Sequence, residues 1–205
     1  MNANHQAIFQ QLSLTPVAFL GHGATSQVYD LGDGRVIRIL GTDSGDYIKQ
    51  LAAFYRQLSQ HRFPFAIPHI EQYGVLAEGC YVLEHHLPGY DMSTIFPKLT
   101  TPQRQQALLS FLDGLQPIHA VLLLEASFGE ILGWQQDINA ASWSTFLHKR
   151  TLVNLETSLP YLHEDLPQVD RLVADFLQRI AELPDPKKHL VHGDYFLANV
   201  MCDVE

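Results

Sequence analysis

The stretch that decides the fold lies near the end of the chain and reads Leu190-Val191-His192-Gly193-Asp194-Tyr195-Phe196-Leu197-Ala198-Asn199-Val200-Met201. Short apolar segments flank it on both sides. Asp194 and Asn199 stand five positions apart. Phosphoryl transfer requires this pair of residue types, because a carboxylate orients the attacking hydroxyl and an amide oxygen helps to hold Mg²⁺.

The same offset occurs in the protein-kinase catalytic loop, H-R-D-x-x-x-x-N. With glycine after the histidine and apolar strands around it, the segment resembles the aminoglycoside phosphotransferase and choline kinase-like branch of the protein kinase-like superfamily. The resemblance implies that Asp194 accepts or orients the hydroxyl proton and that Asn199 binds Mg²⁺. His192 would brace the loop by packing and hydrogen bonding.

The N-terminal third of the chain shows the order strand, glycine loop, strand, turn, strand. Apolar residues 16–20 lead into Gly21-His22-Gly23-Ala24-Thr25-Ser26, and strands are expected over 27–30 and 35–40. A kinase covers the phosphates of ATP in this order, with Gly21, Gly23 and Ser26 at the three glycine positions. Glycines let backbone amides approach an anion closely. A bare Gly-x-Gly is also an ordinary hairpin turn, and the Asp-Asn loop favours the phosphate interpretation.

Arg38 occupies the position of the lysine in the kinase V-A-I-K strand. Arginine keeps the charge and can clamp phosphate oxygens with two hydrogen bonds. Alternatively, Arg38 faces solvent and Arg35, on the other face of the strand, is the binding cation. In a kinase, a glutamate of the next helix pairs with this cation. The helix expected over 45–60 contains no glutamate, so we expect Gln50 to be a neutral partner.

A second hairpin is expected from strands over 69–74 and 80–85, and Leu87-Pro88-Gly89 ends it. In the resembled family this L-P-G marks the hinge after the last strand of the N-terminal lobe. The resemblance implies that backbone groups from Glu84 to His86 bind the adenine edge. His85 and His86 also fit a solvated strand end, and the spacing of a metal site is absent there.

After Gly89 the apolar pattern becomes helical. It predicts a long core helix from Pro102 to about His119, a helix capped by Ser142, and a helix over 162–183. Several carboxylates are candidates for lining a cationic substrate site, although each is equally an ordinary surface charge: Glu130, Asp137, Glu156, Glu164 and Asp165.

These elements together predict an α+β fold of the protein kinase-like, two-lobed type. Residues 1–88 would form a small antiparallel-sheet lobe with the nucleotide-binding sheet, the glycine loop and one helix. Residues 89–205 would form a mostly helical, incomplete lobe that carries the catalytic loop. A single strand pattern or a single loop motif can occur by chance, whereas the occurrence of all these elements in this order along the chain is not a coincidence.

Composition excludes several other classes of protein. The 205 residues are 46% hydrophobic and 17% charged, which is typical of a globular protein. The formal charge of −9, with only 13 scattered Lys and Arg, argues against nucleic-acid binding. The apolar runs are too short to span a membrane. Two cysteines and the lack of a signal-peptide pattern predict reduced thiols in a cytoplasmic protein.

The function implied by the resemblance is transfer of the γ-phosphoryl group of ATP, with Mg²⁺, to the hydroxyl of a small molecule such as an aminoglycoside or another amine-bearing alcohol. An acidic surface suits a cationic substrate. The alternative is a kinase-like module that binds nucleotide or a small molecule without turnover. An unrelated hydrolase is disfavoured, because the chain has no Gly-x-Ser-x-Gly elbow.

The C-terminus departs from the family pattern. The family places a second metal-binding aspartate in a strand shortly after the catalytic asparagine, whereas this chain stops at Glu205. Asp203 follows Asn199 too closely to serve as that residue. The sequence therefore predicts a truncated product or an inactive fragment of a longer kinase.

Overall fold

The structure is a computed structural model, and it describes residues 2–23, 25–122, 127–132 and 138–203. The chain forms two compact units. The first comprises residues 1–121 together with 191–205, and the second comprises residues 122–190. The expected lobe boundary near residue 88 stays a prediction. The predicted catalytic stretch (residues 191–201) folds with the N-terminal part of the chain, although about 70 residues separate them in sequence.

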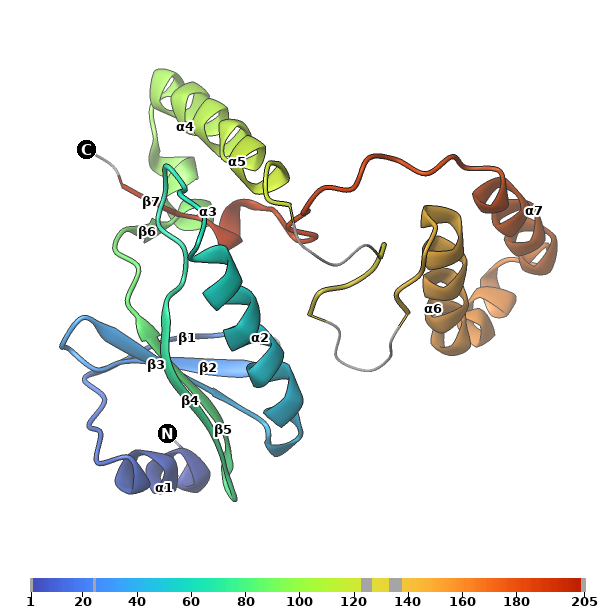
Figure 1. The fold of residues 1–205 in the computed structure, drawn as a ribbon. Helices are drawn as coiled ribbons and strands as arrows, with labels where there is room; N and C mark the ends of the chain where they lie inside the picture. Colours follow the sequence, from blue (N-terminus) through green and yellow to red (C-terminus); the bar gives the residue numbers. More distant parts are fainter. Residues whose placement is uncertain (1, 24, 123–126, 133–137, 204–205) are drawn as a thin grey trace. The chain divides into compact units, whose positions relative to one another are not determined.

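A five-stranded antiparallel sheet forms the centre of the first unit (Figure 1). Its spatial order is β1-β2-β3-β5-β4. The strands are β1 (Ala18–His22), β2 (Ser26–Asp30), β3 (Arg35–Leu40), β4 (Ile70–Leu76) and β5 (Gly79–His85). The structure confirms the five strands expected from the sequence, and β3 has the expected bounds.

Two helices cover opposite faces of this sheet (Figure 1). Helix α1 (Ala3–Gln11) packs Ile8 and Phe9 onto side chains that include Ile37 and Leu83. Helix α2 (Gly45–Leu58) follows the short helix η1 (Thr42–Ser44) and packs on the other face. Alternate residues of a strand point to opposite faces, so the even-numbered positions of β3 and β5 face α2.

The spacing of Ile8, Phe9 and Leu12 predicts a short amphipathic helix over residues 7–14, whereas α1 begins at Ala3, four residues earlier. The side chain of Asn2 accepts a hydrogen bond from the backbone N–H of His5, which caps the helix. A polar cap residue thus extends the helix over residues 3–6, a segment that does not show the helical spacing of apolar residues.

A short two-stranded ribbon joins the L-P-G segment to the catalytic stretch. Strand β6 (Tyr90–Asp91) pairs with β7 (Met201–Cys202), and the backbone N–H of Met92 donates to the carbonyl of Val200 at 2.9 Å. Gly89 is close to this contact, with φ +109°. A Cβ atom there would lie 2.8 Å from the carbonyl oxygen of Cys202, so the approach requires glycine. Helices α3 (Met92–Ile95) and η2 (Phe96–Lys98) follow β6, and η3 (Leu197–Asn199) precedes β7.

The helix expected from Pro102 to His119 is divided. Helix α4 (Thr101–Asp113) ends at Gly114, and α5 (Leu115–His119) begins directly after it. The prediction that it is a core helix is wrong: no residue of α4 is buried, and Leu112 is 57% exposed. Helical spacing identified an apolar face, but spacing carries no information about what packs against that face.

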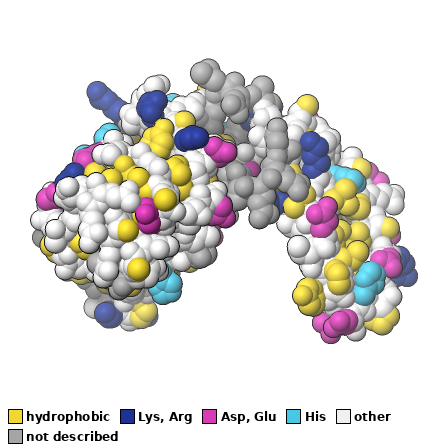
Figure 2. Space-filling view, turned by 90° about the horizontal axis from the view of Figure 1, so that it is seen from below, with side chains coloured by type: hydrophobic (Ala, Val, Ile, Leu, Met, Phe, Trp, Pro, Cys, Tyr) yellow, Lys and Arg dark blue, Asp and Glu magenta, His cyan; other side chains and the backbone are white. Residues whose placement is uncertain are grey.

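The second unit contains two helices, α6 (Trp143–Asp165) and α7 (Val169–Ala181). Ser142 caps α6 by accepting from the N–H of Thr145, as predicted. The single helix expected over 162–183 is wrong, because residues 162–165 complete α6 and α7 begins four residues later. Both helices expose large apolar side chains (right-hand part of Figure 2), among them Leu152, Tyr161, Leu172 and Phe176.

Two further expectations concern the whole chain. Cys80 and Cys202 are free thiols, as predicted. Along the described residues, no helix has the length and apolar content needed to cross a bilayer.

Candidate nucleotide and catalytic site

The predicted catalytic loop closes on itself through its two key residues. The side-chain amide nitrogen of Asn199 donates to the backbone carbonyl of Asp194 at 2.8 Å and to its carboxylate Oδ2 at 2.9 Å. Gly193 has φ +77°, which lets the chain turn directly before Asp194. Because the amide nitrogen of Asn199 faces Asp194, its side-chain oxygen points away from the carboxylate.

Tyr195 fixes this loop to the break between α4 and α5. Its hydroxyl donates to the backbone carbonyl of Phe111 at 2.7 Å, and its ring stacks on the Phe111 ring at 4.2 Å between centroids. His192 makes an edge contact with Tyr195 at 5.5 Å between centroids. The predicted bracing role of His192 is compatible with this ring contact, and it stays a prediction.

The glycine loop joins β1 and β2 as a hairpin. The N–H of Gly23 donates to the carbonyl of Ser26 at 2.9 Å, and Ser26 is the first residue of β2. Gly21 is the fourth residue of β1. Ala24 is outside the described residues. The phosphate-binding role of Gly21, Gly23 and Ser26 stays a prediction that the hairpin geometry permits.

Arg38 has a carboxylate partner that sequence reasoning missed. Its Nη2 lies 2.7 Å and its Nε 3.2 Å from Oε1 of Glu84 on β5. The expected partner, Gln50, is exposed on α2, so that expectation is wrong. Strand register is the reason: β5 lies beside β3, and Val36 stands opposite Glu84, which brings Glu84 to the face and the end of the sheet where Arg38 lies.

Burial and neighbouring charges shift the pKa values of Arg38 and Tyr55. Burial by itself lowers the pKa of the Arg38 guanidinium, but the charge and hydrogen bonds of Glu84 outweigh burial and raise that pKa above its ordinary value. Burial raises the pKa of Tyr55, on α2, to about 12, although the positive charge of Arg38 opposes this shift. Arg38 is therefore a cation and Tyr55 a neutral phenol throughout the physiological range.

The competing cation, Arg35, points to the other face of the sheet. It pairs with Asp33 in the preceding turn and lies 3.8 Å from Glu71 on β4. Arg35 is therefore engaged by two surface carboxylates, and Arg38 is the cation on the α2 face of β3.

The segment expected to bind the adenine edge already uses its first amides. The N–H of His85 donates to the carbonyl of His69 at 3.0 Å, and the N–H of His86 donates to that of Gly34 at 2.9 Å. A purine here would meet the carbonyl groups of the segment or a later N–H. The sequence drew attention to the backbone of Glu84, whereas the structure shows that the side chain of Glu84 is buried.

The described residues fit a magnesium ion that is shared with a nucleotide. They contain no group of three or more His, Cys, Asp or Glu side chains placed to hold a metal ion. Mg²⁺ needs only one or two protein oxygens when phosphates and waters supply the others. Asn199, with the neighbouring carboxylate of Asp194, could provide that number.

The carboxylates considered for a cationic substrate site are dispersed. Glu130 pairs with Arg150 at 2.6 Å, whereas Glu156, Glu164 and Asp165 lie along α6. Asp137 is outside the described residues. The described part of the chain therefore gives no grouped acidic pocket.

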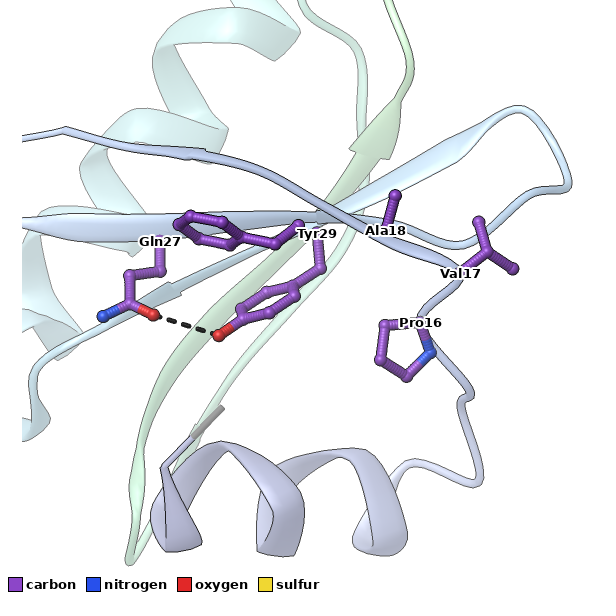
Figure 3. A pocket seen from close by; sticks show the side chains of 6 residues that line it. Pro16, Val17, Ala18, Gln27 and Tyr29 are labelled. Carbon is purple, nitrogen blue, oxygen red and sulfur yellow. Dashed lines mark hydrogen bonds between the residues drawn. The ribbon is translucent and has the colours of Figure 1, made fainter.

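One shallow pocket lies on the α1 face of the sheet (Figure 3). It has a volume of about 370 Å³ and is lined by Pro16, Val17, Ala18, Phe19, Gln27 and Tyr29. The Tyr29 hydroxyl donates to Gln27 at 3.0 Å. Tyr29 and Arg38 occupy opposite faces, so this pocket is separate from the candidate nucleotide site.

Among the solved structures that resemble this fold are aminoglycoside phosphotransferases. The gentamicin complex of APH(2")-IIa is 14% identical with a TM-score of 0.54, covering 88% of this chain and 56% of that chain. The GDP and kanamycin complex of APH(2")-IIIa is 10% identical with a TM-score of 0.53, covering 87% and 57%. This chain therefore spans little more than half the length of these relatives. No curated protein sequence matches it.

The sequence itself matches a family description over most of its length. The family described as "Phosphotransferase enzyme family" matches residues 16–205, which includes the glycine hairpin, Arg38 and the whole catalytic loop. Because this match covers most of the sequence, the chain belongs to the phosphotransferase enzyme family.

Proposed function

We propose that this chain is, or forms part of, an ATP-dependent phosphotransferase that acts on the hydroxyl group of a small molecule. The observation that carries the proposal is the bonded pair Asp194 and Asn199. The asparagine holds the aspartate through its nitrogen and leaves its oxygen for a cation. The family match and the folding of this loop with the glycine hairpin in one compact unit support the proposal.

Each residue has a defined part in the proposed reaction. Asp194 orients the acceptor hydroxyl and takes its proton as the new O–P bond forms, while the bond between the γ-phosphorus and the bridging oxygen of ADP breaks. Arg38 and the backbone amides of the glycine hairpin hold phosphate oxygens. Mg²⁺, held by Asn199, would neutralise charge on the phosphates.

The substrate class proposed is a hydroxyl-bearing amine, such as an amino sugar or an amino alcohol. The net charge of −9 attracts cations at long range. Two of the structural relatives are complexes with gentamicin and kanamycin, which are aminoglycosides. These compounds are ligands of the relatives, and they guide the choice of test compounds for this chain.

The test is ADP release from ATP and Mg²⁺ in the presence of amino sugars, choline-like alcohols and neutral sugars. We expect turnover with an amine-bearing acceptor, and a loss of at least about a hundredfold in Asp194→Ala, because general-base catalysis contributes about 10²–10⁴-fold. Asp46→Asn is the matched control, since Asp46 is an exposed carboxylate whose one ion pair among the described residues is with Lys49. Nucleotide binding without turnover for any acceptor would instead indicate the non-catalytic binding module.

A further inference from the structure

The ion pair between Arg38 and Glu84 lies entirely within the sheet. Two guanidinium nitrogens of Arg38, Nη2 and Nε, converge on one oxygen of Glu84, at 2.7 and 3.2 Å. The Glu84 side chain is only 6% exposed, whereas that of Arg38 is 35% exposed. Backbone hydrogen bonds between β3 and β5 fix the relative positions of the two residues.

Helix α2 supplies no carboxylate to this cation. Its one acidic residue, Asp46, is exposed and pairs with Lys49 at 3.1 Å. Tyr55 of α2 lies close enough for its pKa to respond to both charges of the pair, but it is a neutral phenol. The partner that orients Arg38 therefore comes from the sheet.

The pair leaves one edge of the guanidinium for a ligand. A guanidinium presents its donors as a planar fork, and here one edge of the fork is used by Glu84. In the described part of the chain, Nη1 of Arg38 makes no hydrogen bond or ion pair, and the other oxygen of Glu84, Oε2, is buried without a partner. Arg38 is thus held on its buried side and open on its exposed side.

We propose that Glu84 is the positioning residue for Arg38, and that it sets the guanidinium to receive phosphate oxygens of the nucleotide from within the sheet. This inference rests on the proposed function, because it assumes that Arg38 meets phosphate. As a consequence, phosphate binding by the protein does not depend on the position of α2.

The alternative role for Glu84 is structural neutralisation of a partly buried cation. The two roles differ in one measurable respect. A positioning role makes the contribution of Arg38 to phosphate binding depend on Glu84, whereas neutralisation affects folding stability and leaves that contribution unchanged.

The experiment is a double-mutant cycle in nucleotide affinity, measured by calorimetry with ATP and with adenosine. The variants are Arg38→Met, Glu84→Met and the double variant. We expect Arg38→Met to weaken ATP binding by about tenfold or more, as for loss of a hydrogen bond to a charged group, and to leave adenosine binding unchanged. In the Glu84→Met background the same substitution should weaken ATP binding by less than about threefold.

Two further variants keep the cycle interpretable. Glu84→Gln preserves the side-chain shape and one oxygen acceptor, so it replaces Glu84→Met in the cycle if the latter fails to fold. With Gln at position 84 some coupling between the two positions persists, smaller than with Met, because the oxygen still accepts from Arg38. Gln50→Glu, which puts a carboxylate on the exposed side of α2, should leave the ATP affinity of the Glu84→Met variant unrestored.

The outcomes separate the inference from the proposed function. If wild-type protein binds ATP no more tightly than adenosine, the proposed function and this inference fail together. If it prefers ATP, but Arg38→Met costs the same factor in both backgrounds, the inference alone fails. Restoration of affinity by Gln50→Glu would also overturn it, because the helix would then be able to supply the partner.

Discussion

The hydroxyl of Tyr195 donates a hydrogen bond to the backbone carbonyl of Phe111, 84 residues earlier in the chain, at 2.7 Å. This bond links the residue next to Asp194 to the end of α4. The carbonyl of Phe111 lies just before the helix break, so the catalytic loop uses a backbone group that a continuous helix would have used itself.

Tyr195→Phe should destabilise the first unit and loosen the catalytic loop. It leaves the Phe111 carbonyl without its partner, and we expect a loss of about 1 kcal/mol in the free energy of unfolding. Urea denaturation checks the value. Tyr161→Phe is the control, since Tyr161 is 72% exposed on α6. An equal loss in both variants would contradict the assignment of this bond as a structural link.

Gly114→Ala tests why the helix divides at this point. Gly114 has helical dihedral angles, so alanine would ordinarily stabilise it by up to about 1 kcal/mol. Here a Cβ atom would lie 2.8 Å from the Tyr195 hydroxyl oxygen. We therefore expect Gly114→Ala to lower the melting temperature in wild type.

In the Tyr195→Phe background, the same substitution should be neutral or stabilising, because the hydroxyl oxygen that meets the Cβ atom is gone. Thermal unfolding of the four proteins of this cycle measures the change of sign. The explanation is wrong if alanine at position 114 has the same effect with and without the hydroxyl.

Gly89→Ala should disrupt the ribbon that joins the L-P-G segment to the catalytic stretch. Both Gly89 and Gly34 have positive φ, +109° and +86°. A Cβ atom at Gly34 meets nothing within 4 Å, whereas one at Gly89 meets the Cys202 carbonyl oxygen at 2.8 Å. Gly34→Ala should cost about 1–2 kcal/mol from backbone strain alone.

For Gly89→Ala we expect the same strain and a further loss of about 1 kcal/mol or more from overpacking. Denaturation of both variants gives the difference between them. Hydrogen exchange at Met92, whose amide bonds to Val200, should rise only in Gly89→Ala. Equal exchange in the two variants would argue that the ribbon does not depend on this glycine.

His5 should make stability sensitive to acid. Burial, and secondly the N-terminal positive charge, lower the pKa of His5 below its ordinary 6.5. Its Nδ1 lies 2.9 Å from the Tyr29 hydroxyl. As pH falls below 6.5 the unfolded chain takes up the proton first, so the folded state loses stability down to the folded-state pKa. Above pH 6.5 the residue is neutral in both states and contributes no pH dependence.

The check is the unfolding free energy at pH 7.5 and 5.5 for wild type and His5→Gln. Wild type should lose more stability between these two values than the variant does. His61→Gln, at an exposed position, is the control for the other histidines. A variant that loses as much as wild type would show that the acid sensitivity arises elsewhere.

Much of the fold was predictable, because its signals are local. The mainly apolar run that follows the turn at residues 31–34 predicted the bounds of β3, and the serine before Trp143 marked the start of α6. The five-position spacing of Asp194 and Asn199 identified the loop whose side chains the structure finds bonded to one another. Each of these features depends on residues only a few positions apart, where sequence spacing and spatial distance agree.

The partners of Arg38 and Phe111 were decided by tertiary structure. Glu84 is 46 residues from Arg38, and it becomes the partner only because the sheet order puts β5 next to β3. Likewise, the helix predicted from Pro102 is continuous by its apolar spacing, and the division coincides with the place where the Tyr195 hydroxyl reaches its backbone. The sequence by itself determined the five strands of the sheet, their order along the chain and the spacing of Asp194 and Asn199, because these signals are local. Strand register and the packing of loops decided which distant side chains meet, because they depend on the tertiary structure.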